Sequence, residues 1–154
     1  MWQSFRNFVS SLQTYHLLSP DLAVRQQVNQ QLRSRPCLSC QEWFIRYWTP
    51  PAVPEALPEE LVEFTFTCLS DYSGLSLGQV VPQDRLLEDL QFPLVCWFDW
   101  GLNLCGDFEQ RFGIDITDSF DETSLITVAD LVEYLHREFC EGNSSGQSEF
   151  PLKT

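Results

Sequence analysis

The sequence predicts an all-α fold, in which a helical bundle follows a helical extension. Three observations support this prediction. Apolar residues recur at the three- and four-residue spacing of amphipathic helices in several stretches of the chain. Helix start signals stand before these stretches, and Gly or Pro often follows them. Apolar residues make up 44% of the 154 residues, which is enough for a hydrophobic core.

Residues 1–49 are predicted to form the helical extension. A first helix is expected over residues 3–17, where large apolar side chains recur at helical spacing: Trp2, Phe5, Phe8, Val9 and Leu12. Ser19 as N-cap and Pro20 as the first helical residue then predict the start of a second helix. This helix is expected to end near Leu32, because a Ser-Arg-Pro break follows.

A third helix and a linker complete this part of the chain. Ser39 and Glu42 form a capping box, which predicts a short helix rich in aromatic residues: Trp43, Phe44, Tyr47 and Trp48. A Pro-Pro pair stops that helix, and four prolines within residues 49–58 predict an extended linker. We therefore place a domain boundary at residues 50–58.

Residues 59–139 are predicted to form the second domain. Acids after Pro58 favour a helix start, and Gly74 and Gly113 can adopt the left-handed conformation that ends a helix. Thr127 with Asp130 gives a variant of the capping box. The expected elements are three main helices near 59–72, 99–112 and 127–139 and a short helix around 118–124. A flexible tail, residues 140–154, is expected to follow.

Two motifs in this second domain resemble the acyl carrier proteins. They are the turn Phe-Gly-Ile-Asp-Ile at residues 112–116 and the helix Thr-Val-Ala-Asp-Leu-Val-Glu-Tyr-Leu at residues 127–135. A Glu-Asp-Leu turn at residues 88–90 is also similar. The resemblance covers residues 58–139 and implies a carrier-type helical bundle. It also implies a phosphopantetheine arm on a serine at the start of the second helix of that bundle.

That serine is absent. Counting back from Phe112 places Phe98 at the expected position, and no Ser or Thr occurs between Leu77 and Ile116. Because phosphoryl transfer needs a hydroxyl acceptor, we expect no phosphopantetheine, no other cofactor and no enzymatic activity. A divergent carrier protein that is still modified remains an alternative.

The aromatic residues around the missing serine have two interpretations. Trp97, Phe98 and Trp100 pack into the core of the bundle, or they form an exposed anchor for a protein partner. Asp99 between them is expected to be the N-cap of the helix that follows.

The charge distribution indicates the kind of partner. Net charge is −13; residues 1–49 carry +3 and residues 50–154 carry −16. Such a chain repels phosphates, so we expect no nucleic acid partner. Five acids resemble the face that carrier proteins present to basic partners, although charged runs are also ordinary solvated surface: Asp107, Glu109, Asp118, Asp121 and Glu122.

Cys37 and Cys40 form the one close pair among six cysteines, and they precede a capped helix. A Cys-x-x-Cys at a helix N-terminus is typical of thiol redox proteins, but no thioredoxin-like strand pattern surrounds it. A zinc site would need two further ligands. Redox or metal function is therefore an alternative, and we expect no metal.

No secretory signal precedes the first helix, and the longest apolar run, residues 92–98, is too short to span a membrane. We therefore expect a cytoplasmic protein with reduced thiols and no transmembrane segment. The favoured function is a non-catalytic protein–protein interaction module, built on a carrier scaffold that has lost its phosphopantetheine site. Its predicted partner carries a basic patch.

Overall fold

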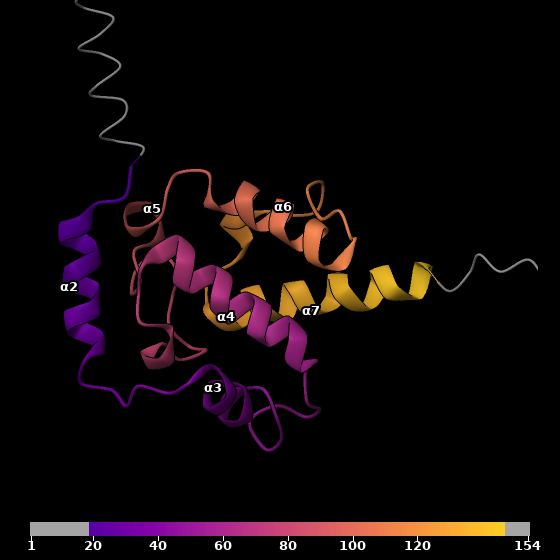
Figure 1. Cartoon of the computed structure of the whole chain (residues 1–154), viewed down its shortest axis with the longest axis horizontal. Helices are drawn as coiled ribbons and strands as arrows, with labels where there is room; N and C mark the ends of the chain where they lie inside the picture. The colour runs from indigo at the N-terminus through magenta and orange to yellow at the C-terminus, as the bar shows by residue number, and fades with distance from the viewer. Residues whose placement is uncertain (1–18, 147–154) are drawn as a thin grey trace, which may run out of the picture.

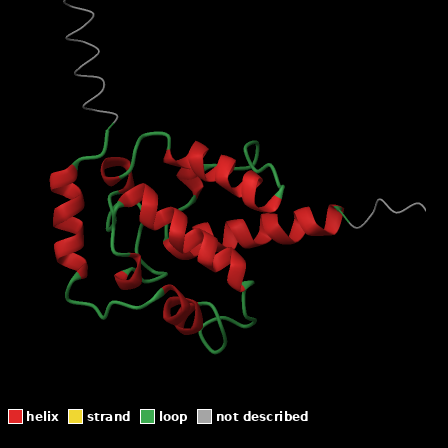
Figure 2. Ribbon diagram, viewed as in Figure 1, coloured by secondary structure: helices red, strands yellow, loops and turns green. Residues whose placement is uncertain are grey.

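All regular secondary structure in residues 19–146, the part of the chain that the structure describes, is helical (Figure 2). The structure is a computed structural model. The α-helices are α2 (Leu22–Leu32), α3 (Cys40–Tyr47), α4 (Glu59–Ser73), α5 (Phe92–Val95), α6 (Trp100–Phe112) and α7 (Val128–Ser145). The all-α prediction is confirmed. The helix expected over residues 3–17 lies outside the described residues.

Helix α2 begins later than the sequence indicated. Asp21, not Ser19, is the N-cap, because its carboxylate accepts hydrogen bonds from the N–H groups of Ala23 at 3.0 Å and Val24 at 3.2 Å. Only Val28 and Leu32 of this polar helix are buried. Helix α2 packs against α5 along one edge of the molecule (Figure 1).

Helix α3 begins at the predicted capping box, in which Ser39 and Glu42 satisfy each other's N–H groups. Its Trp43 is fully buried, and the indole N–H donates to the Val80 carbonyl at 2.8 Å. Helix α3 packs against α4, so this aromatic residue fills the space between α3 and the loop that follows α4.

One hydrophobic core joins the described N-terminal helices to the rest of the molecule. Val28, Leu32, Trp43 and Trp48 belong to the same buried cluster as the apolar faces of α4, α6 and α7. The Pro-rich segment connects α3 to α4; its Val53 and Leu57 pack against this core, and the N–H of Leu57 donates to the Trp48 carbonyl at 3.0 Å. The predicted boundary at residues 50–58 thus separates helices in the sequence, whereas their buried side chains share one core.

Most ends of the C-terminal helices lie at the residues that the sequence signals predicted. Gly74 ends α4 with φ 64° and Gly113 ends α6 with φ 70°, both left-handed. Thr127 and Asp130 form the capping box of α7. The short helix expected around 118–124 is a 3-10 turn, η2 (Glu122–Ser124).

Helix α7 is longer than predicted, because residues 140–145 are helical rather than part of a flexible tail. Phe139 packs against Phe112, with ring centroids 5.2 Å apart, and extends the apolar contact. The hydroxyls of Ser144 and Ser145 donate to the carbonyls of Cys140 and Glu141, four residues earlier, in this last polar turn. Residues 147–154 lie outside the described part.

A long connection, residues 75–99, runs from α4 to α6 and carries the features that position the candidate site. Near its start, Asp84 is buried and binds Arg35, with Nη1–Oδ2 at 2.6 Å. The same carboxylate accepts the Val81 N–H at 2.9 Å. This bond raises the pKa of Arg35 and ties the segment before α3 to the connection. None of the described helices is long and apolar enough to cross a bilayer.

Candidate functional site

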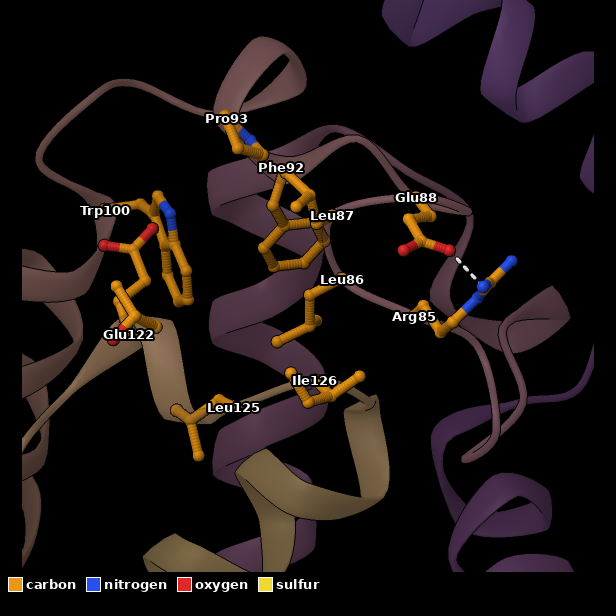
Figure 3. Close-up of a pocket in the computed structure, with 11 residues that line it drawn as sticks. Arg85, Leu86, Leu87, Glu88, Phe92, Pro93, Trp100, Glu122, Leu125 and Ile126 are labelled. Carbon is orange, nitrogen blue, oxygen red and sulfur yellow. Dashed lines mark ion pairs between the residues drawn. The ribbon is translucent and has the colours of Figure 1, made fainter.

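The second half of this connection forms one wall of an apolar groove of about 350 Å³ (Figure 3). The other walls are the start of α6 and the segment around η2. The groove combines large apolar side chains with a few charged ones at its margin: Arg85, Leu86, Leu87, Glu88, Phe92, Pro93, Trp100, Glu122, Thr123, Leu125 and Ile126. Pockets of this size that are mostly apolar are the usual sites for ligand or partner groups.

Backbone hydrogen bonds hold the walls together. The N–H of Leu86 donates to the Ile126 carbonyl at 2.9 Å, next to an isolated antiparallel bridge between Arg85 and Thr127. The N–H of Phe92 donates to the Leu86 carbonyl at 2.9 Å, which closes the loop between them. These bonds fix residues 85–92 against the segment that enters α7, so the groove is formed by ordered backbone.

Adjacent leucines point in opposite directions at this wall. Leu86 is 4% exposed and belongs to the core, whereas Leu87 is 64% exposed. Ile126, which lies next to Leu86 in Figure 3, is 56% exposed. The groove therefore has an apolar rim that is open to solvent as well as an apolar floor.

Aromatic rings form the opposite end. Phe92 and Trp100 meet edge to face, with centroids 5.2 Å apart, and Phe120 packs on the other side of Trp100 at 6.2 Å. Gly101 permits this packing, because a Cβ there would lie 2.8 Å from the Phe120 ring. Trp100 is only 2% exposed, so it lines the groove as part of the core and is not an exposed anchor.

The other two aromatic residues of the predicted anchor lie at the surface. Trp97 is 42% exposed and Phe98 is 61% exposed. The two interpretations from the sequence therefore divide this segment between them: Trp100 packs in the core, and Trp97 and Phe98 do not. Asp99 is the N-cap residue of α6 as predicted, but its carboxylate makes no capping hydrogen bond.

The five predicted acids lie on two different elements, helix α6 and the segment before α7. Asp107 is half-buried and accepts a hydrogen bond from the Tyr72 hydroxyl on α4, which accompanies a raised Tyr72 pKa caused first by burial and then by this bond. Glu109 is exposed further along α6. Asp118, Asp121 and Glu122 are exposed together on the segment before α7. Only this last group adjoins the groove, since Glu122 lines it.

The margin of the groove is net negative. Arg85 pairs with Glu88 and, through Nε at 3.1 Å, with Asp89, so two carboxylates neutralise its charge. The hydrogen bond from Arg85 lowers the pKa of Asp89, which keeps this pair ionised in mildly acidic solution. Asp121 and Glu122 add two charges without a cation among the described ion pairs.

The cysteine pair lies on another part of the molecule and lacks activating surroundings. Cys37 is exposed, Cys40 is half-buried, and both are free thiols. Burial raises the pKa of Cys40, and Glu63 and Glu59 raise it further. A redox cysteine needs the opposite shift. Within residues 19–146, no three metal-ligating side chains come together.

Apart from Trp100, the apolar residues of the groove were not among the predicted site residues. The sequence pattern alone assigned no binding role to Leu86, Leu87, Leu125 or Ile126. Two signals were available. An adjacent Leu-Leu pair in a non-helical segment places one side chain on each side of the chain. Ile126 stands directly before an N-cap, where an apolar residue frequently marks the entry to a helix.

No protein-family model, curated protein or solved structure matches this chain. The resemblance to acyl carrier proteins therefore stays a prediction. Phe98, which stands at the expected serine position, lies two residues before α6 begins, and its side chain is exposed.

Proposed function

We propose that this chain is a non-catalytic protein-binding module, whose partner inserts apolar side chains into the groove and places a basic patch against the acids beside it. The observation that carries the proposal is an apolar groove with an exposed apolar rim next to a net negative margin. Exposed apolar surface of this kind is typical of interaction sites on soluble proteins.

The apolar rim supplies the affinity. Leu87 and Ile126, which both line the groove, are exposed, and Leu94, Phe98 and Leu102 are exposed on neighbouring segments. Covering one such side chain completely is worth roughly 1.5–3 kcal/mol before the costs of association are subtracted.

The acids supply orientation and association rate. Asp118, Asp121 and Glu122 lie together before α7, and a basic patch on the partner would be steered toward them. Because these side chains are exposed, their contribution falls as salt rises.

The same proposal includes the absence of a phosphopantetheine arm, since Phe98 offers no hydroxyl where the carrier resemblance expects one. It also includes a cytoplasmic location, which six free thiols, two of them buried, would suit. The intact mass after co-expression with a phosphopantetheinyl transferase tests the first point. A gain of one arm, mapped to residues 90–105, would contradict it and favour a divergent carrier.

The proposal is tested by quantitative capture from native lysate with the full chain as bait. We expect one or more proteins to be retained by the wild type and lost with Leu87→Ser combined with Ile126→Ser. The control is Ile45→Ser, because Ile45 on α3 is 56% exposed, as Ile126 is, but lies outside the groove. Retention that is equal in all three forms would contradict the proposal.

The charges are tested on the protein so identified. Reversal of Asp118, Asp121 and Glu122 to Lys should slow association with it, and the effect should be larger at low salt. Reversal of three exposed acids elsewhere, Glu55, Glu63 and Asp71, serves as the matched control. An equal effect of the two triple variants would show that only the overall charge matters.

A further inference from the structure

We infer that residues 1–18 of this chain bind the groove in the same molecule, and that a partner must displace them. The inference rests on the proposed function, because it assigns a specific occupant to the same docking groove. Three features support it: where the chain leaves the described structure, the apolar pattern of the segment, and the charges of the two surfaces.

The chain leaves the described structure beside the groove. The N–H of Asp21 donates to the Leu94 carbonyl at 2.8 Å, and Arg25 Nη2 donates to the Val95 carbonyl at 2.7 Å. These bonds fix the start of α2 against α5, as Figure 1 shows. The first two residues of α5, Phe92 and Pro93, line the groove. Residues 1–18 are therefore tethered at the groove margin.

The length of the segment is sufficient. Eighteen residues extend about 27 Å as a helix and further as an extended chain. A short tether gives a local concentration on the order of millimolar. Even a weak contact is then substantially occupied within one molecule.

The apolar pattern of the segment matches the groove. Its large apolar residues follow the spacing with which an amphipathic helix anchors in a hydrophobic groove: Trp2, Phe5, Phe8, Val9 and Leu12. The groove offers a floor formed by Leu86, Phe92 and Trp100 and an apolar rim that includes Leu87 and Ile126. Aromatic anchors in apolar pockets are the usual hot spots of such contacts.

The charges are also complementary. Residues 1–18 contain Arg6 and no Asp or Glu. Glu88 and Glu122 line the groove, Asp89 and Asp121 stand next to them in the sequence, and Arg85 is the one basic residue that lines it in the described part of the chain. The segment thus has the chemistry proposed for the partner, namely apolar anchors with positive charge, and the two compete for one site.

The consequence is a reduced apparent affinity for the partner. A site that is occupied in cis is available to a partner only in the fraction of molecules that have released the segment. A partner with a stronger basic patch than the single Arg6 would gain from the acids before α7 and displace it.

The test is photo-crosslinking in the full chain, with p-benzoylphenylalanine in place of Phe8. We expect crosslinks to residues 85–94 or 122–126. A matched control carries the same group in place of Asn7, which lies on the opposite face at helical spacing. A mixture of nitrogen-15-labelled and unlabelled chains separates crosslinks within one molecule from those between two.

A second variant tests the groove itself. Leu87→Ser with Ile126→Ser removes two apolar side chains from the rim and should reduce the crosslink yield roughly tenfold. A tenfold change corresponds to about 1.4 kcal/mol of binding free energy. Ile45→Ser should leave the yield unchanged. Circular dichroism of each variant checks that the fold is retained.

The possible outcomes are distinct. Crosslinks outside the groove, or crosslinks only between labelled and unlabelled chains, would overturn binding in cis. If the crosslinks lie outside the groove but Leu87→Ser with Ile126→Ser still fails to retain the lysate partner, the inference about residues 1–18 fails. The proposed function then stands. If crosslinks reach the groove but Leu87→Ser with Ile126→Ser captures the same lysate proteins as the wild type, residues 1–18 are the occupant of the groove. The proposal that a partner docks there is then wrong.

Discussion

The two parts of the long connection between α4 and α6 differ in how far other elements cover their apolar side chains. On the first, which we call the closed side (residues 35–48 and 76–84), Trp43 is fully buried and its indole N–H has a carbonyl acceptor. The backbones approach so closely that a Cβ on Gly78 would lie 2.0 Å from the Leu38 oxygen. On the second, the groove side (residues 85–100 and 120–126), apolar side chains such as Leu87 are exposed.

The difference is one of coverage rather than composition. Helix α3 lies over the closed side and supplies the aromatic side chain and capping box that complete it. No described element lies over the groove side in the same way. Apolar residues in one continuous connection therefore stabilise the fold where α3 covers them and remain available for binding where it does not. This contrast predicts that equivalent substitutions on the two sides will have very different effects.

The largest effect is expected from Trp43→Ala on the closed side. Truncation of a buried Trp typically costs about 3–5 kcal/mol, from lost burial and from the cavity that remains. Here the Val80 carbonyl also loses its donor. The free energy of unfolding from chemical denaturation measures the cost. A loss below about 1 kcal/mol would mean that the closed side is not a tightly packed part of the core.

A smaller effect is expected from Asp84→Asn. This substitution removes the charge that pairs with Arg35, and an amide in its place satisfies the surrounding donors poorly. Hydrogen bonds to charged groups are worth about 1.5–3 kcal/mol, so we expect a loss of about 2 kcal/mol. Glu88→Gln is the control on the groove side, where the ion pair with Arg85 is exposed and its loss should be barely measurable.

The helices could be predicted from the sequence because their signals are local. The capping boxes at Ser39 and Thr127 and the left-handed glycines 74 and 113 stand where the sequence placed them. The errors fall at the ends of helices. Asp21 caps α2 in place of Ser19, because its carboxylate reaches two N–H groups, and α7 continues through residues 140–145.

The groove could not be predicted, because residues 40 positions apart in the sequence form it. Hydrogen bonding between Leu86 and Ile126 joins its walls, and no local pattern specifies that pairing. The sequence also did not decide which residues of the aromatic segment face inward. Trp100 is fixed by packing against Phe92 and Phe120, both of which lie in other segments.

The third effect is a dependence of stability on alkaline pH, which tests whether the groove side is anchored in the core. Burial raises the pKa of the Cys96 thiol, next to α5, from 9.0 to about 12. Between these values the thiol ionises in the unfolded chain but not in the folded one, so stability is full below pH 9 and falls as pH rises. We expect a loss of roughly 1 kcal/mol per pH unit above pH 9 from this group.

Cys96→Ala should flatten this dependence, measured as the free energy of unfolding at pH 8, 9 and 10 under reducing conditions. Cys68, whose pKa burial raises to about 11, contributes a parallel loss that the variant leaves in place. Cys37→Ser, at an exposed position on the closed side, is the control and should leave the slope unchanged. An unaltered slope in Cys96→Ala would mean that this thiol is accessible to solvent.

The smallest effect is expected at Leu87, and its neighbour provides the comparison within one pair of residues. Leu86→Ala removes a core side chain and should cost about 2–5 kcal/mol. Leu87→Ala should cost no more than about 1 kcal/mol, because most of the side chain is exposed. Equilibrium denaturation of both variants measures the ratio. Equal costs would mean that an unrecognised element covers the groove side as firmly as α3 covers the closed side, and the apolar rim would then be part of the fold rather than a binding surface.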